Sequence, residues 1–172
     1  FWQRKMTIFS ANRAASILPV SENLAQAMRS FGINSEMKVV YNAIDTDVFV
    51  PKEKIKNKGI QLVHVSSLDP IQKNPLLLLE AFQQILLTHR NAQLNIISDG
   101  DFHFFQPEIQ RLGISDHVIF HGIKDAKGIA QLLQQADLFI LTSRFENLPC
   151  VLIEARSCGV PVVSTNVGGI DE

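Results

Sequence analysis

The sequence predicts an α/β fold in which a parallel sheet carries helices on both faces. Between residues 60 and 164, short apolar runs of strand length alternate with longer segments of helical length. This alternation is typical of a parallel sheet, because parallel strands need a crossover connection that is usually a helix. The strand segments are apolar along most of their length, which indicates burial on both faces of the sheet.

Composition excludes several classes of protein. The chain has 172 residues, of which 46% are hydrophobic, and a net charge of -1. A chain of this size can bury a core without a disulfide or a metal. Acidic and basic residues are mixed along the sequence, so there is no charge pattern of a general nucleic-acid or membrane binder. The longest apolar run, 75–79, is too short for a transmembrane segment. The sequence has no cluster of closely spaced Cys and His residues that would indicate a metal site.

The first 58 residues are the less regular part of the sequence. Ser21 is placed to cap a helix that continues to Ser30 and ends at Gly32. The polar run from Lys52 to Gly59 indicates a domain edge. In order, we predict a helix over 1–13, a strand over 15–20, a helix over 21–30, a strand over 38–41 and a linker over 43–58.

Regular alternation follows the linker. Asn74-Pro75 starts one helix and Pro149 another, because the fixed φ of proline suits the first helical turn. We predict strands over 60–65, 93–97, 117–120, 138–141 and 161–164. We predict helices over 74–89, 102–112 (interrupted near Pro107), 124–135 and 149–158.

Suggestive polar and glycine residues follow the ends of these strands. They lie in 66–73, 98–101, 122–123 and 143–154. Ligands of parallel sheets bind outside the carboxyl ends of the strands. The sequence therefore predicts a binding site at this edge.

Two carboxylates stand out in the last of these segments. Glu146 precedes the helix that starts at Pro149, and Glu154 lies about one turn inside it. Near a helix start that can hold a phosphate, they would accept hydrogen bonds from sugar hydroxyls, and the positive potential there should keep both ionised. The alternative is that Glu146 only complements the helix dipole and Glu154 is a solvated helix residue.

Other candidate residues are weaker taken one at a time. Lys73 could neutralise a diphosphate, or be an ordinary surface lysine. Gly100 and Gly122 could let the backbone approach a ligand, or be plain turn glycines. His64 is interpreted as a satisfied core histidine, while His121 is a minor candidate for lining the site.

Taken together, the motifs resemble a known family, the family 4 (group 1) retaining glycosyltransferases of the GT-B fold. Glu146 and Glu154 match its E-x7-E motif, and Val65-Ser66-Ser67-Leu68 with Lys73-Asn74 resembles its donor-phosphate loop. The resemblance continues through Gly168-Gly169 to Glu172 and begins near Ala14. It implies that residues 59–172 form a Rossmann-like donor domain that is truncated at its C-terminus. Residues 43–58 would be a linker, and residues 1–42 would be a remnant of the acceptor domain with the entry strand.

The resemblance also implies roles for residues. Glu146 and Lys73 would be catalytic, with Glu146 on the transferred sugar and Lys73 on the diphosphate, and Glu154 would contact the ribose. The remaining donor-binding residues would be Ser67, Gly100, Gly122, Ile123, Asn147, Leu148, Cys150 and Val151, with the base near Gly122 and Ile123. Ser67 stands where the family usually has an arginine, and Asn147 where it often has a glycine.

The expected function is therefore donor binding in a retaining glycosyltransferase of glycan or polysaccharide biosynthesis. We expect a nucleoside-diphosphate sugar as donor, no metal or other cofactor, no nucleic-acid partner, and a glycan or lipid-linked acceptor bound through the missing domain. The fragment alone should be inactive, and cytoplasmic or peripheral at the inner membrane face. Alternatives are a non-catalytic nucleotide-sugar-binding module, and a GT-B sugar-nucleotide epimerase or sugar phosphate synthase. A glycosidase is the least favoured, because its carboxylates would lie on opposite sides of the scissile bond.

Overall fold

The chain divides into two compact units. A computed structural model describes residues 2–55 and 59–172. One unit consists of the residues up to Ala43 together with Glu146–Pro149 and Asn166–Glu172, and the other consists of Ile44–Phe145 and Cys150–Thr165. The predicted linker includes residues 56–58, which lie outside the described residues, as does residue 1 of the first predicted helix.

The larger unit contains the predicted parallel sheet. Its strands are β1 (Gln61–Val65), β2 (Gln93–Ile97), β3 (Val118–Phe120), β4 (Leu138–Leu141) and β5 (Val162–Ser164). They lie in the order β3-β2-β1-β4-β5, and each neighbouring pair is parallel. The chain thus runs outward from β1 to β3 and then returns to place β4 on the other side of β1. The predicted fold class is confirmed.

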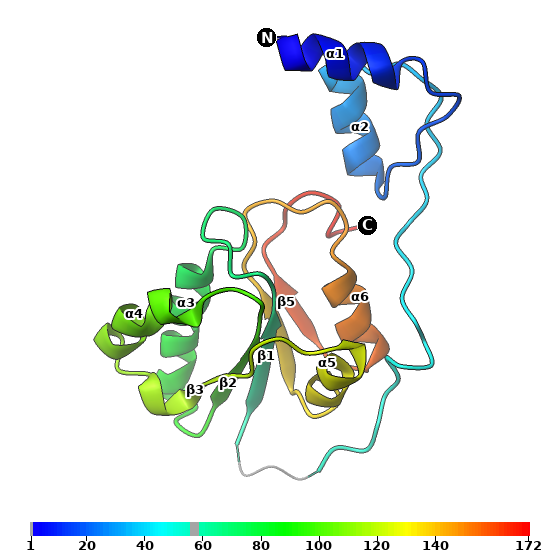
Figure 1. The fold of residues 1–172 in the computed structure, drawn as a ribbon. Coiled ribbons are helices and arrows are strands. Elements are labelled where there is room, and N and C mark those ends of the chain that lie inside the picture. Colours follow the sequence, from blue (N-terminus) through cyan, green and yellow to red (C-terminus); the bar gives the residue numbers. More distant parts are fainter. Residues whose placement is uncertain (1, 56–58) are drawn as a thin grey trace. The chain divides into compact units, whose positions relative to one another are not determined.

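Helices cover both faces of this sheet (Figure 1). On one face lie α3 (Pro75–Thr88) and α4 (Gln106–Arg111), and on the other lie α5 (Ala126–Leu133) and α6 (Cys150–Ser157). Two short 3-10 helices, η1 (Phe102–Phe105) and η2 (Ser115–His117), complete the described elements. The predicted interruption near Pro107 is the change from η1 to α4.

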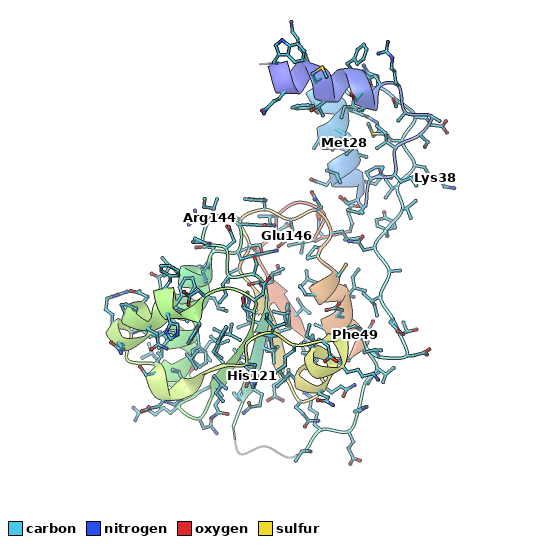
Figure 2. All side chains as sticks on the ribbon, in the orientation of Figure 1. Met28, Lys38, Phe49, His121, Arg144 and Glu146 are labelled. Carbon is cyan, nitrogen blue, oxygen red and sulfur yellow. The ribbon has the colours of Figure 1, made fainter. Side chains whose placement is uncertain are left out.

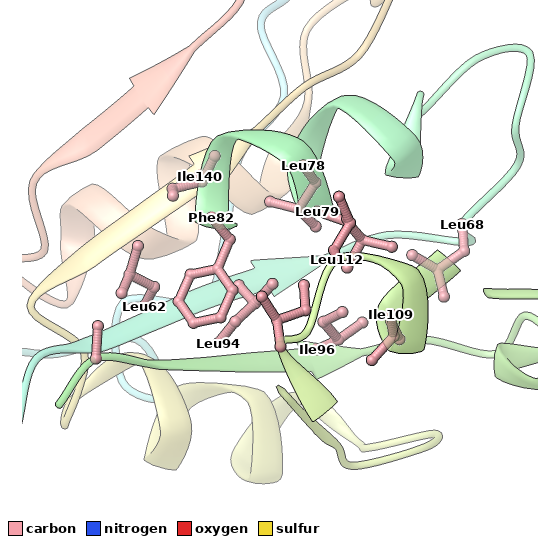
Figure 3. Packing of buried hydrophobic residues seen from close by; sticks show 12 residues of the cluster. Leu62, Leu68, Leu78, Leu79, Phe82, Leu94, Ile96, Ile109, Leu112 and Ile140 are labelled. Atoms are coloured by element: carbon pink, nitrogen blue, oxygen red, sulfur yellow. The ribbon is translucent and has the colours of Figure 1, made fainter. Parts of the chain in front are cut away.

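The hydrophobic core explains why α3 lies where it does. Apolar side chains of α3, led by Leu78 and Phe82, pack on β1 and β2 (Figure 3). Phe82 and Leu94 are completely buried. Because successive strand residues point to opposite faces, Val63 is buried on the other side of the sheet. Burial on both faces accounts for the near-continuous apolar strands of the sequence.

The smaller unit contains two helices, α1 (Trp2–Ala11) and α2 (Glu22–Phe31). The predicted cap is confirmed, because the Ser21 hydroxyl accepts a hydrogen bond from the Leu24 N–H. Gly32 ends α2 with a φ of 108° and donates back to the last turn.

The two strands predicted in this unit are wrong. Segment 15–20 runs beside residues 36–40, but their pairing amounts to an isolated parallel bridge between Ile17 and Met37. Pro19 has no N–H to contribute to a ladder, and a two-stranded pairing is marginal without further strands beside it.

One predicted helix is shorter than expected. The helix predicted over 124–135 is α5, and it begins only at Ala126, because Asp125 is the N-cap and its carboxylate accepts from the Gly128 N–H at 2.9 Å. At its other end the helix stops at Leu133, two residues early.

Candidate functional site

The candidate site of the larger unit lies at the carboxyl edge of its sheet. The strand order reverses between β1 and β4, which makes their carboxyl ends the topological switch point of the fold. In open α/β sheets, this is where ligands bind. The loops of interest are therefore those that follow β1 and β4, together with the loop after β2.

The loop after β1 starts from a buried histidine. His64 is completely buried, with Nδ1 2.8 Å from the Ile140 carbonyl oxygen and Nε2 2.7 Å from the Ser66 hydroxyl. Burial is the main cause that lowers its pKa to about 4, and the charge of Lys73 lowers it further. The interpretation as a satisfied core histidine is confirmed.

These hydrogen bonds have a defined direction. At neutral pH the ring is uncharged, and a carbonyl oxygen can only accept, so Nδ1 donates to Ile140. Nε2 must then accept from the Ser66 hydroxyl, whose oxygen in turn accepts from the Leu68 N–H at 3.1 Å. Leu68 is buried and has a φ of 56°, which a leucine adopts only where its surroundings impose it. His64 thus helps to define the turn in which Ser67 lies.

Ser67 and Gly100 are in direct contact. A Cβ on Gly100 would lie 2.3 Å from the Ser67 carbonyl oxygen. The Gly100 N–H donates to the Ser98 hydroxyl at 2.8 Å. The missing side chain of Gly100 therefore lets the loop after β1 pack on the loop after β2.

Lys73 is held at the switch point by the end of β4. The Thr142 hydroxyl donates to the Lys73 carbonyl oxygen at 3.0 Å. The Arg144 N–H donates to the Gln72 carbonyl oxygen at 2.7 Å, and the Arg144 guanidinium donates to the Asn74 amide oxygen at 3.3 Å. The backbone around Lys73 is consequently bound to a strand that lies about seventy residues further along the chain.

Gly122 and Ile123 form an open part of the same edge. Gly122 has a φ of 65°, and no described atom lies within 4 Å of the place where its Cβ would be. Ile123 is 76% exposed, which is unusual for an isoleucine next to a strand end. The preceding His121 is turned to the sheet, where Nε2 lies 2.9 Å from the Asn95 amide oxygen. Burial and Lys124 lower the pKa of His121.

Helix α6 carries three further candidate residues, Cys150, Val151 and Glu154. Cys150 is exposed at the first position, while Val151 and Glu154 are half-buried. Burial raises the pKa of Glu154. The helix start was expected to keep the carboxylate ionised, which would lower its pKa, so the shift is in the opposite direction. The reason is that the helix dipole acts within the first turn, and Glu154 comes after it.

The other three candidates, Glu146, Asn147 and Leu148, belong to the smaller unit. Their loop is bound through its backbone: the Gly169 N–H donates to the Asn147 carbonyl oxygen at 2.9 Å, and the Asn42 amide donates to the Leu148 carbonyl oxygen at 2.6 Å.

Gly169 is packed too closely to carry a side chain, since a Cβ would lie 2.7 Å from the Cβ of Ser21. The Glu172 carboxylate accepts from the N–H groups of Glu22 and Asn23, at 2.7 and 2.8 Å, and so caps α2. Gly169 and Glu172 therefore hold the segment 166–172 on the start of α2.

Sequence reasoning missed several residues that hold these loops in place within their own units. Thr142, Arg144 and Asn42 were given no role, although each makes a hydrogen bond to a candidate segment distant in the sequence. A usable signal existed for Thr142 and Arg144, because polar residues directly after a buried strand lie at the edge where ligands bind.

In residues 2–55 and 59–172, no group of three or more His, Cys, Asp and Glu side chains is placed to hold a metal ion. No helix in that part of the chain has the length and apolar character needed to cross a membrane.

Comparison with known proteins identifies relatives in sequence. The model of the family described as "Glycosyl transferases group 1" matches residues 45–172. The N-acetyl-alpha-D-glucosaminyl L-malate synthase of Bacillus anthracis is 35% identical over 148 residues, which are 81% of this chain and 38% of that protein.

Solved structures agree on the fold. Sucrose-phosphate synthase from Thermosynechococcus elongatus has a TM-score of 0.87 at 19% identity, over 98% of this chain and 45% of that one. Anabaena Alr3699/HepE, solved in complex with UDP and glucose, has a TM-score of 0.83 at 25% identity, over 98% of this chain and 49% of that one. The chain thus spans less than half the length of each of these proteins.

Proposed function

This chain belongs to the group 1 glycosyltransferases, and we propose that it binds the nucleoside-diphosphate sugar from which the complete protein transfers a sugar. The observation that carries the proposal is the position of Lys73 at the switch point. Its backbone, in the loop after β1, is hydrogen-bonded to Thr142 at the end of the neighbouring strand β4. The family match includes this whole edge of the sheet. The similarity to a protein solved with UDP and glucose supports the same ligand class.

In this proposal, Lys73 holds the diphosphate and stabilises the charge that develops on it as the sugar leaves. Backbone groups of Ser67 and Gly100 line the region that holds the diphosphate. Glu154 accepts a hydrogen bond from a ribose hydroxyl, and the open surface at Gly122 and Ile123 receives the base.

The residues just before α6 and in its first turn have roles of their own in this proposal. Glu146 accepts hydrogen bonds from hydroxyls of the transferred sugar, while Asn147, Leu148, Cys150 and Val151 provide backbone N–H groups for sugar and phosphate. Transfer would retain the anomeric configuration, use no metal ion and deliver the sugar to a glycan or lipid-linked acceptor held by the rest of the protein. We place the reaction in the cytoplasm or at the inner membrane face.

A second candidate is a module that binds nucleotide sugars without transferring them. One specific observation favours it. Ser67 lies at the phosphate loop with its carbonyl against Gly100, and its side chain supplies no charge for a leaving diphosphate. An epimerase acting on the same donor is a third reading, which differs only in its product.

Calorimetry tests donor binding. The chain is titrated with UDP-, GDP- and ADP-sugars and with the matching nucleoside diphosphates, as wild type and as Glu146→Ala. We expect one base to be preferred, and the substitution to weaken binding of the sugar nucleotide about tenfold or more, as loss of a charged hydrogen bond does, while binding of the diphosphate is little changed. Glu80→Ala, on the exposed side of α3, is the matched control.

Product analysis separates the candidates. The complete protein should form a glycoside from donor and acceptor, and the 172-residue chain alone should bind without turnover. Wild-type protein that binds none of the three sugar nucleotides would refute the proposal. Binding without any product from the complete protein would favour the non-catalytic module, and an epimerised sugar nucleotide would favour the third reading.

A further inference from the structure

Arg144 occupies the switch point beside Lys73. It is the first exposed residue after β4, because Leu141, Thr142 and Ser143 are all buried. Its backbone N–H is bound to Gln72 and its guanidinium to Asn74, the two residues that flank Lys73. Figure 2 labels its side chain at this end of the sheet.

The two cations come from adjacent strands whose ends are fixed to each other. Lys73 follows β1 and Arg144 follows β4, and these strands pair directly. The Thr142 hydroxyl also bridges the two segments by donating to the Lys73 carbonyl oxygen. The backbone positions of both cations are therefore set by the same short set of hydrogen bonds.

Three carboxylates in the loops at this edge accept hydrogen bonds from nearby backbone N–H groups. Asp69 accepts from the N–H groups of Ile71 and Gln72, at 2.9 and 2.7 Å. Asp101 accepts from the His103 N–H and Asp125 from the Gly128 N–H, each at 2.9 Å. These acidic groups cap turns and helices, so they serve as local acceptors in their own loops.

Arg144 also differs from the other arginine of this unit whose contacts are well defined. Arg111 forms a two-point salt bridge with Glu108, through Nε at 2.8 Å and Nη2 at 2.5 Å. Within the part of the chain that the structure describes, the one partner of the Arg144 guanidinium is the neutral amide oxygen of Asn74, at 3.3 Å. A guanidinium has five N–H donors in a planar fork that matches a phosphate group.

We propose that Arg144 binds the diphosphate of the donor as a second cation next to Lys73. The inference rests on the proposed function, since it names a further residue of the same donor site. Asn74 orients the guanidinium, whose remaining N–H groups contact phosphate oxygens. Two cations from neighbouring strands would neutralise the two phosphates that leave together with the nucleoside.

Binding constants of two variants test this role. Arg144→Gln and Arg144→Lys are titrated by calorimetry with UDP, GDP and ADP and with the corresponding nucleosides, at low and at high salt. We expect Arg144→Gln to weaken diphosphate binding about tenfold or more and to reduce its salt dependence. Nucleoside binding should stay unchanged. Arg144→Lys should retain part of the affinity, because it keeps the charge and loses the fork.

Arg90→Gln is the matched control. Arg90 is an exposed arginine three residues before β2, at the opposite edge of the sheet, and its loss should not affect binding. Equal diphosphate affinity of wild type and Arg144→Gln would overturn the inference and leave the proposed function standing. An equal loss of nucleoside and diphosphate affinity would also overturn it, because it would reveal a structural role. A wild type that binds no diphosphate would refute both.

Discussion

His64 shows how one side chain connects the core to the candidate site. It links the end of β4 to the loop that carries Ser67 and Lys73, through Ile140 on one side and Ser66 on the other. Its residue type was recognised from the sequence as structural. Its effect on the loop after β1 was not recognised, because the hydrogen bond to Ile140 joins positions 76 residues apart.

The buried state of His64 predicts a loss of stability in acid. Burial lowers the pKa to about 4, whereas the unfolded chain would bind a proton near the ordinary value of 6.5. Between these two values the unfolded state binds more protons, so stability falls as the pH falls from 6.5 to 4 and levels off below. A pKa shift of this size corresponds to about 3 kcal/mol in the free energy of unfolding.

Urea denaturation of wild type and His64→Gln between pH 4 and 7 measures this effect. The stability difference between the two proteins should shrink by most of that amount on acidification. His103→Gln, an exposed position, should follow wild type throughout. A stability difference that is independent of pH would show that His64 does not titrate in this way.

At the scale of elements, Gly100 and Gly122 look alike in sequence but differ in the structure. Gly100 has the Ser67 carbonyl where a Cβ would lie, whereas Gly122 has open space and a positive φ. The sequence offered the same two interpretations for both. Only the positions of neighbouring loops distinguish a glycine required for close packing from one required for its backbone conformation.

Alanine substitutions should separate these two cases. Gly122→Ala should cost about 1 kcal/mol, the typical strain of a side chain at positive φ. Gly100→Ala should cost more, because the Ser67 backbone must move, and it should also weaken the proposed diphosphate binding by displacing the loop after β1. Thermal denaturation and calorimetry with nucleoside diphosphates measure both effects. Equal costs, with unchanged binding for Gly100→Ala, would contradict this assignment.

At the scale of the whole molecule, the larger unit depends on packing of α3 against β1 and β2. Phe82 lies at the centre of that packing and is completely buried (Figure 3). Truncating a buried phenylalanine to alanine removes its burial energy and leaves a cavity.

Phe82→Ala should therefore lower the free energy of unfolding by about 3–5 kcal/mol. Phe104, which is 78% exposed on η1, provides the matched control, and Phe104→Ala should change stability by less than about 0.5 kcal/mol. Urea denaturation monitored by circular dichroism measures both variants. Similar losses for the two would show that the core does not carry the stability of this unit.

The sequence by itself determined the order and type of the elements in the larger unit. Strands such as 93–97 and 138–141 were predicted with their observed bounds, because apolar runs, prolines, glycines and caps are local signals. The same signals placed candidate residues of the larger unit, such as Gly100 and Gly122, in loops at the carboxyl edge. They failed at 15–20 and 38–41, where a strand requires neighbours that local sequence does not reveal.

Tertiary structure alone decided the strand order and therefore which loops meet. The return of the chain places β4 beside β1, and this brings Arg144 to Asn74, 70 residues away. Contacts of that kind depend on long-range hydrogen bonds and on the packing of both sheet faces, which no local pattern encodes. For that reason Lys73 could be proposed from its position in the sequence, whereas the contacts of Arg144, Thr142 and Gly100 became visible only in the folded chain.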